Sequence, residues 1–313
     1  MRLCLMIEGQ EDVTWEDWVA LADACEASGL EALFRSDHYL SGDGRVGRGS
    51  HDAWTTLAAL ARHTRRIRLG TMVSPVTFRH PSVLANAATT VDHVSGGRVE
   101  LGLGAGWYEL EHTTFGFPFP PMGERMAMLE EQLAIVTGLW TEPEFSFAGE
   151  HYRLDRCPGL PKPVQAPHPP VIVGGAGKRR TVDLAARFGS EYNIVSGDVG
   201  ECRRLRGRLD AAAEAAGRER LVLSVMTTTL VGRDRADLVR RADRLAELYY
   251  PAAAGESLLA ENGDDWIAGT VDELVDRFAG LAEAGVERAM LQHLDHRDLE
   301  AVELLGEVAQ RVA

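Results

Sequence analysis

The sequence predicts an α/β fold, a (β/α)8 TIM barrel with insertions, on three observations. Short apolar runs alternate with helical segments eight times along the 313 residues, which is typical of a parallel barrel. No polar linker interrupts these repeats, so we expect one domain over residues 1–313. Hydrophobic residues make up 45% of the chain and charged residues 26%, a balance that allows a large packed core. An open doubly wound sheet is the alternative, because a count of strands does not establish closure.

The first half of the chain contains four of the expected strands. Thr14 with Asp17 three residues later is typical of a capping box that opens a helix, and Gly29 is suited to closing it. Pro81 fits the start of another helix, where a missing N–H costs nothing. The expected strands are 2–7, 31–36, 67–73 and 98–104, and the expected helices are 14–29, 52–63, 81–94 and 126–140.

The second half repeats the pattern, with a second capping box at Thr270 and Glu273 and a helix end at Gly285. Here the expected strands are 170–173, 191–195, 221–231 and 288–292, and the expected helices are 178–188, 200–216, 234–249, 271–284 and 299–312. Three segments lack this periodicity and are expected to be irregular insertions: 107–122, 141–169 and 251–268, the last a mobile loop.

Composition excludes several classes of function. A net charge of −14 and a pI near 5.2 would repel a phosphate backbone, so we expect no nucleic-acid partner. The first apolar run, 3–7, is too short for a signal peptide or a membrane span, so we expect no membrane partner. The four cysteines lack a Cys-x-x-Cys pair, which favours reduced thiols and a cytoplasmic location: Cys4, Cys25, Cys157 and Cys202. His293 and His296 are a weak metal signal without a third ligand, and we expect no metal.

In a parallel barrel, function lies at the carboxyl ends of the strands. The segments that follow the expected strands include 36–39, 102–107, 174–178 and 292–296. The glycines of 102–107 do not form a dinucleotide fingerprint, because Trp107 occupies the place of its last glycine. Those of 174–178 do not form a Walker A loop, because Ile172 and Arg179 occupy two of its required positions.

What remains at 174–178 is a glycine-rich turn that enters a helix with a positively charged first turn. Free backbone N–H groups and the helix dipole favour a phosphate there. Alternatively, the glycines only permit a tight turn.

Two further positions carry candidate chemistry. His38 beside Asp37 is suited to donating a proton or a hydrogen bond to a ring cofactor, since imidazole titrates near neutral pH. Alternatively, this Asp-His pair only satisfies the local backbone. Trp107 is interpreted as the wall of a ring-binding substrate pocket, whereas Phe115, Phe117 and Phe119 are more typical of a core or a subunit contact.

Several of these motifs resemble a known family. The segments concerned are Ser-Asp-His at 36–38, Arg-Leu-Gly-Thr-Met-Val at 68–73, 96–107 (GGRVELGLGAGW) and 168–181 (HPPVIVGGAGKRRT). Together they resemble bacterial luciferase-like monooxygenases, most closely the actinobacterial branch of coenzyme F420-dependent oxidoreductases. The similarity covers nearly the whole chain.

The resemblance implies a homodimer with an isoalloxazine-type ring over the carboxyl mouth of the barrel. It also implies a non-prolyl cis peptide at Met72–Val73 beneath that ring. His38 is the implied catalytic residue. The implied cofactor contacts are Asp37, His38, Thr71, Met72, Val73, Gly104 and Gly106 around the ring, and Gly174, Gly175, Ala176, Gly177, Lys178 and Thr181 at the phosphate.

The function implied is hydride transfer between coenzyme F420 and a small organic molecule. The alternatives are an FMN-dependent luciferase-like monooxygenase and a non-catalytic cofactor-binding barrel. Sugar-phosphate dehydrogenases of this superfamily carry an acidic residue where this chain has Trp107, which argues against a sugar phosphate and favours a flat or apolar substrate.

Overall fold

The strands of the computed structural model close into a barrel; residues 1–45, 47–251, 253–263 and 265–313 are described. Consecutive strands around the barrel pair in parallel, β9 pairs with β10, and β12 returns to β1. This closure confirms the TIM barrel and rules out the open sheet. The barrel strands are β1 (Arg2–Ile7), β2 (Ala32–Arg35), β3 (Arg68–Thr71), β5 (Val99–Gly104), β8 (Val171–Gly174), β9 (Glu191–Val195), β10 (Val222–Gly232) and β12 (Arg288–Gln292).

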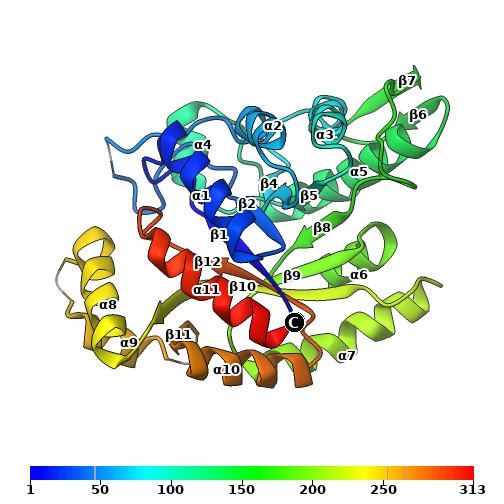
Figure 1. Ribbon diagram of the computed structural model, residues 1–313. Helices are drawn as coiled ribbons and strands as arrows, with labels where there is room; N and C mark the ends of the chain where they lie inside the picture. The colour runs from blue at the N-terminus through cyan, green and yellow to red at the C-terminus, as the bar shows by residue number, and fades with distance from the viewer. Residues whose placement is uncertain (46, 252, 264) are drawn as a thin grey trace.

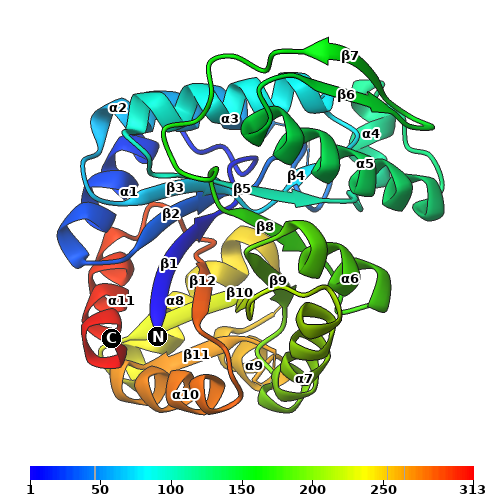
Figure 2. The ribbon, with the colours of Figure 1, turned by 90° about the vertical axis from the view of Figure 1, so that its right-hand side faces the viewer.

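Helices surround the strands, as Figure 2 shows. Both expected capping boxes are present, at Thr14 with Asp17 and at Thr270 with Glu273, and Gly29 ends the first helix at a φ of 84°. None of the described helices is long and apolar enough to cross a membrane. The surrounding helices are α1 (Trp15–Ser28), α2 (Ala53–His63), α3 (Pro81–Ser95), α5 (Met122–Thr141), α6 (Arg179–Phe188), α7 (Val199–Ala215), α8 (Arg235–Tyr249), α10 (Val271–Glu283) and α11 (Leu299–Val312).

The segments expected to be irregular contain ordered elements. A short helix, α4 (Glu109–Phe115), lies within 107–122; outside these segments, a two-residue strand, β4 (Ser74–Pro75), pairs with β5. An antiparallel hairpin of β6 (Phe145–Ala148) and β7 (Arg153–Cys157) forms within 141–169 and projects from the barrel at the upper right of Figure 1.

The expectation that 251–268 is irregular throughout is wrong. This segment holds α9 (Gly255–Glu261) and the start of β11 (Ile267–Thr270), which pairs with the last four residues of β10. Leu259 of α9 is buried in a cluster with Leu238 and Leu245 of α8, so packing on α8 compensates for weak local periodicity. Residues 252 and 264 of this range lie outside the described part of the chain.

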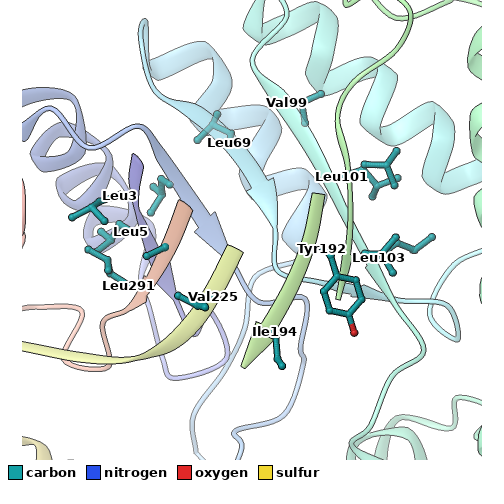
Figure 3. Close-up of a cluster of buried hydrophobic side chains, with 14 of the residues drawn as sticks. Leu3, Leu5, Leu69, Val99, Leu101, Leu103, Tyr192, Ile194, Val225 and Leu291 are labelled. Atoms are coloured by element: carbon teal, nitrogen blue, oxygen red, sulfur yellow. The ribbon is translucent and has the colours of Figure 1, made fainter. Parts of the chain in front are cut away.

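The apolar core has two layers because successive strand residues point to opposite faces. One set of side chains fills the space between strands and helices, among them Leu3, Leu5 and Leu101 in Figure 3. The other set points into the barrel, where Met6 and Phe34 are fully buried. Fully burying each large apolar side chain stabilises the fold by about 1.5–3 kcal/mol.

Charged side chains close the amino end of the barrel. Arg288, 2% exposed, lies 2.6 Å from Glu100, 3.0 Å from Glu191 and 2.7 Å from Glu31. Burial raises the pKa of Glu100, but the charges and hydrogen bonds of Arg288 and Arg68 outweigh it, so the pKa lies below its usual value. The charged side chains at the amino end therefore pair with one another and fill that end of the barrel. The open site lies at the other end.

Candidate active site

A cavity of about 860 Å³ opens at the carboxyl ends of the strands. This volume is within the range of small-molecule and cofactor sites. Asp37, Thr71 and Gly177 are not among the residues that line it. The other expected site residues do line it: His38, Met72, Val73, Gly104, Gly106, Trp107, Gly174, Gly175, Ala176, Lys178 and Thr181.

His38 is oriented by a carboxylate. Its Nδ1 lies 2.8 Å from Oε2 of Glu111, whose side chain is fully buried. Oε1 of Glu111 accepts hydrogen bonds from the backbone N–H groups of Tyr39, at 2.5 Å, and Leu40, at 3.0 Å. Both carboxylate oxygens are thus committed, and the Nε2 edge of the imidazole is left for the cavity.

This pairing changes the protonation of His38. Burial lowers its pKa, but the hydrogen bond and charge of Glu111, with smaller contributions from Glu8 and Asp37, outweigh burial and raise the pKa above its usual value. Burial raises the pKa of Glu111. The hydrogen bond and charge of His38 and the two backbone hydrogen bonds outweigh burial, so the pKa of Glu111 lies below its usual value. The pair therefore favours an imidazolium beside a carboxylate more strongly than the two side chains would in water.

Asp37 has a different environment from its neighbour in sequence. It is 1% exposed and accepts hydrogen bonds from Ser74 and Arg79, each at 2.5 Å. Arg79 also lies 2.6 Å from Asp52, the N-cap of α2. Asp37 lies behind the cavity wall, and its hydrogen bonds link the end of β2 to the segment after β3.

The floor of the cavity is built around Val73. The Met72–Val73 peptide is cis, as the family resemblance implies. A Cβ atom at Gly104 would lie 2.7 Å from Val73, one at Gly174 would lie 3.0 Å from it, and one at Gly102 would lie 2.0 Å from the Thr71 carbonyl oxygen. These three glycines on β5 and β8 therefore make room for the segment that carries Val73.

The turn after β8 presents an uncapped helix end to the cavity. No side chain caps the N-terminus of α6, whose N-cap residue is Lys178. Gly177 has a φ of 65°, and its N–H donates to the Tyr192 hydroxyl at 2.8 Å, which holds the turn in place. Among the described residues none forms an ion pair with Lys178, whereas Arg179 is 95% exposed and lies 3.5 Å from Asp183. The first turn of α6 therefore offers free N–H groups and an unneutralised cation.

Aromatic side chains divide into two groups at the mouth of the cavity. Trp107 is 64% exposed, stacks on Tyr108 with ring centroids 4.9 Å apart, and meets His38 edge-on at 5.6 Å. Phe117 instead packs against Phe78 at 4.7 Å and is absent from the cavity lining, so its cluster supports the wall from outside.

Several cavity residues were not identified from the sequence. Glu8 and Gln10 follow β1, Gln292 ends β12, and Tyr249 ends α8. Glu111 was the most consequential omission. No apolar stripe marks it in the sequence, because Phe115 is 49% exposed and the buried residues of α4 are Glu111 and His112.

The histidines near the end of β12 contact nearby polar groups of the protein. Nε2 of His293 lies 3.1 Å from the Asp298 carbonyl oxygen, and His296 lies 3.6 Å from Asp17. Within the described residues no cluster of three or more potential metal ligands is found.

Comparisons with known proteins point to one family. The model of a family described as luciferase-like monooxygenase matches residues 4–288. The chain is 27% identical over 263 residues to the FMNH2-dependent dimethylsulfone monooxygenase of Pseudomonas putida, covering 82% of this chain and 71% of that protein. It is 36% identical over 184 residues to the F420-dependent glucose-6-phosphate dehydrogenase of Amycolatopsis mediterranei, covering 58% of this chain and 54% of that protein. The chain thus spans about half the length of the second relative.

A solved structure shows the same fold. The crystal structure of monooxygenase RslO1 from Streptomyces bottropensis superimposes with a TM-score of 0.83 at 23% identity, covering 100% of this chain and 98% of the other.

Proposed function

This chain belongs to the luciferase-like monooxygenase family, and we propose that it is a coenzyme F420-dependent oxidoreductase that transfers hydride to or from a small organic molecule. The observation that most strongly supports this function is the His38–Glu111 pair at the cavity wall. Hydride transfer at a carbon that bears oxygen requires a proton at that oxygen, and a cavity-facing imidazole with a raised pKa meets this need.

The cavity residues fit a deazaflavin with a phosphate-bearing side chain. The glycines around Val73 leave a flat floor without projecting side chains at 104 and 174. At the adjoining edge, the free N–H groups of α6 and Lys178, which no described residue pairs with, suit a phosphate. Met72 and Val73 would lie beneath the ring, and Lys178 and Thr181 would hold the phosphate.

A bound deazaflavin would supply the hydride acceptor or donor. The chain supplies the proton. In the reductive direction, Nε2 of His38 donates a proton to the substrate oxygen while the carbon gains hydride; in the oxidative direction, both transfers reverse. Glu111 fixes the imidazole orientation and stabilises its protonated form. Trp107, exposed at the mouth, offers a flat apolar face to the substrate.

Identity with an F420-dependent dehydrogenase, at 36%, exceeds that with the FMNH2-dependent monooxygenase, at 27%, and supports deazaflavin over FMN. FMN-dependent monooxygenation is the second candidate, because the match with the FMNH2-dependent monooxygenase covers more of this chain than the match with the F420-dependent dehydrogenase. The acidic residue that this superfamily's sugar-phosphate dehydrogenases carry is replaced by Trp107, so we do not extend the first relative's substrate to this protein.

Two parallel titrations of the apoprotein, one with coenzyme F420 and one with FMN, test the proposal. Binding is measured by fluorescence. We expect tighter binding of F420. Lys178→Ala should weaken it by about tenfold, equivalent to about 1.4 kcal/mol. Arg179→Ala removes the neighbouring cation, which points away from the cavity and pairs with Asp183, and should leave affinity within about threefold. Tight FMN binding with negligible F420 binding would establish the second candidate instead.

A further inference from the structure

Charges in the cavity are divided between two sides. Lys178 and Arg180 line the side formed by the α6 turn, whereas Glu8, Glu11 and Asp43 line the side that follows β1 and β2. The basic side accounts for the phosphate of the proposed cofactor. The acidic side has no role in that assignment.

Glu8 differs from the other two acids on its side. Glu11 forms an ion pair with Arg48, and Asp43 lies 2.5 Å from Arg45. In the described part of the chain, no arginine, lysine or histidine forms an ion pair with Glu8, although it lines the same cavity as His38.

Neutral amides hold Glu8 instead. Its Oε1 accepts a hydrogen bond from Nε2 of Gln292 at 2.5 Å, and its Oε2 accepts one from Nε2 of Gln10 at 2.8 Å. Both amides are themselves oriented. The Thr228 hydroxyl donates to Oε1 of Gln292 at 2.9 Å, and the Ser36 hydroxyl donates to Oε1 of Gln10 at 2.5 Å.

Two hydrogen-bond chains therefore end on one carboxylate. On each side a hydroxyl donates to an amide oxygen, and the amide nitrogen donates to Glu8. A carboxylate has about four acceptor positions, so two remain for a ligand in the cavity. Such an acceptor favours hydroxyl and ammonium groups and repels carboxylates and phosphates.

We propose that Glu8 is a specificity-determining residue that accepts a hydrogen bond from a hydroxyl or ammonium group adjacent to the reacting carbon of the substrate. The substrate class is then a diol or an amino alcohol, or the corresponding carbonyl compound, with no acidic group at that position. This inference rests on the proposed function, because the reacting carbon is defined by hydride transfer near His38. The charge of Glu8 also contributes to the raised pKa of His38, consistent with the two groups facing one ligand.

A matched set of cyclohexane derivatives tests the inference: the vicinal diol, the vicinal amino alcohol and the vicinal hydroxy acid. They share a ring and an alcohol and differ only in the neighbouring group. Binding to the F420-loaded protein is measured by ligand-observed NMR at millimolar concentrations, and F420 reduction is followed alongside. We expect the diol and the amino alcohol to bind at least about tenfold more tightly than the hydroxy acid.

Glu8→Gln keeps the size of the side chain and removes its charge, and should bring the amino alcohol and hydroxy acid affinities within about threefold of each other. Asp43→Asn removes an equal charge from a carboxylate that already has a cation partner, and should preserve the ranking. Equal ranking of the three probes by the parent, absence of diol and amino-alcohol binding, or an unchanged ranking in Glu8→Gln would each overturn the inference. Failure of F420 to bind would refute the proposed function separately, because that titration contains no probe.

Discussion

The two ends of the barrel use charged residues in opposite ways. At the amino end, Glu31, Glu100 and Glu191 all contact Arg288, and Arg2 and Arg68 add two further cations, so three carboxylates face three cations in one network. At the carboxyl end, Lys178 has no ion-pair partner among the described residues, and the acidic and basic groups lie on different sides of the cavity. Arg288 therefore stabilises the fold, whereas Lys178 remains available to a ligand.

The comparison predicts that substitutions at the two ends separate stability from activity. At the amino end, the loss of a buried charge leaves its partners uncompensated in a low-dielectric interior. At the carboxyl end, the loss of an available group removes an interaction with a ligand and little of the core.

Arg288→Met should lower the free energy of unfolding by about 3–5 kcal/mol, because it leaves Glu191 buried without its cation and Glu100 with Arg68 alone. Urea denaturation gives the measurement. Arg2→Met is the matched control, since Arg2 also pairs with Glu31 but its side chain is 47% exposed; its cost should be about 0–1 kcal/mol. Equal losses in the two variants would contradict the comparison. If Arg288→Met yields no folded protein, Arg288→Lys should restore folding.

His38→Ala should lower turnover by about a hundredfold to ten-thousandfold and leave cofactor affinity within about threefold, because proton transfer acts in the transition state. Steady-state kinetics and cofactor titration separate the two quantities. His38→Asn retains an N–H near the position of Nδ1 that can donate to Glu111, but it does not titrate in this range. Recovery of turnover in His38→Asn would show that the imidazole has only a structural role.

Glu111→Gln should shift the pH dependence of the reductive reaction. The protonated donor form of His38 exists below its pKa and is lost as the pH rises through it. Removing the Glu111 charge leaves burial, which lowers that pKa, as the dominant influence, so the alkaline limb should move to lower pH. The glutamine carbonyl oxygen can still accept from the backbone of Tyr39 and Leu40, so the fold should persist. An unmoved limb in the kcat/KM profile would exclude this pairing from the reaction.

The sequence predicted the barrel well because its signals are local. Capping boxes such as Thr270 with Glu273 and alternating apolar runs require only neighbouring residues. The segment 251–268 was misjudged because α9 is seven residues long and depends on the packing of Leu259 against α8. A contact of this kind has no local signature.

The candidate site shows the same division. His38 and the glycines of 174–178 were identified because they follow strands directly. Glu111 is separated from His38 by 73 residues, and only the fold brings α4 against the segment that follows β2. The acceptor role of Glu8 depends on Gln292, which is 284 residues away. Sequence spacing alone cannot report these pairings.

The close fit of Val73 between strands has a consequence for protein engineering. The cavity floor cannot be raised from the β5 side, because a side chain at Gly102 would meet the Thr71 carbonyl oxygen at 2.0 Å and one at Gly104 would meet Val73 at 2.7 Å. It can be lowered from the opposite side by trimming Val73 itself, since the glycines that face it have no side chains to collapse into the space. A redesign of the floor beneath the cofactor ring would therefore begin at residue 73 and keep the three glycines fixed.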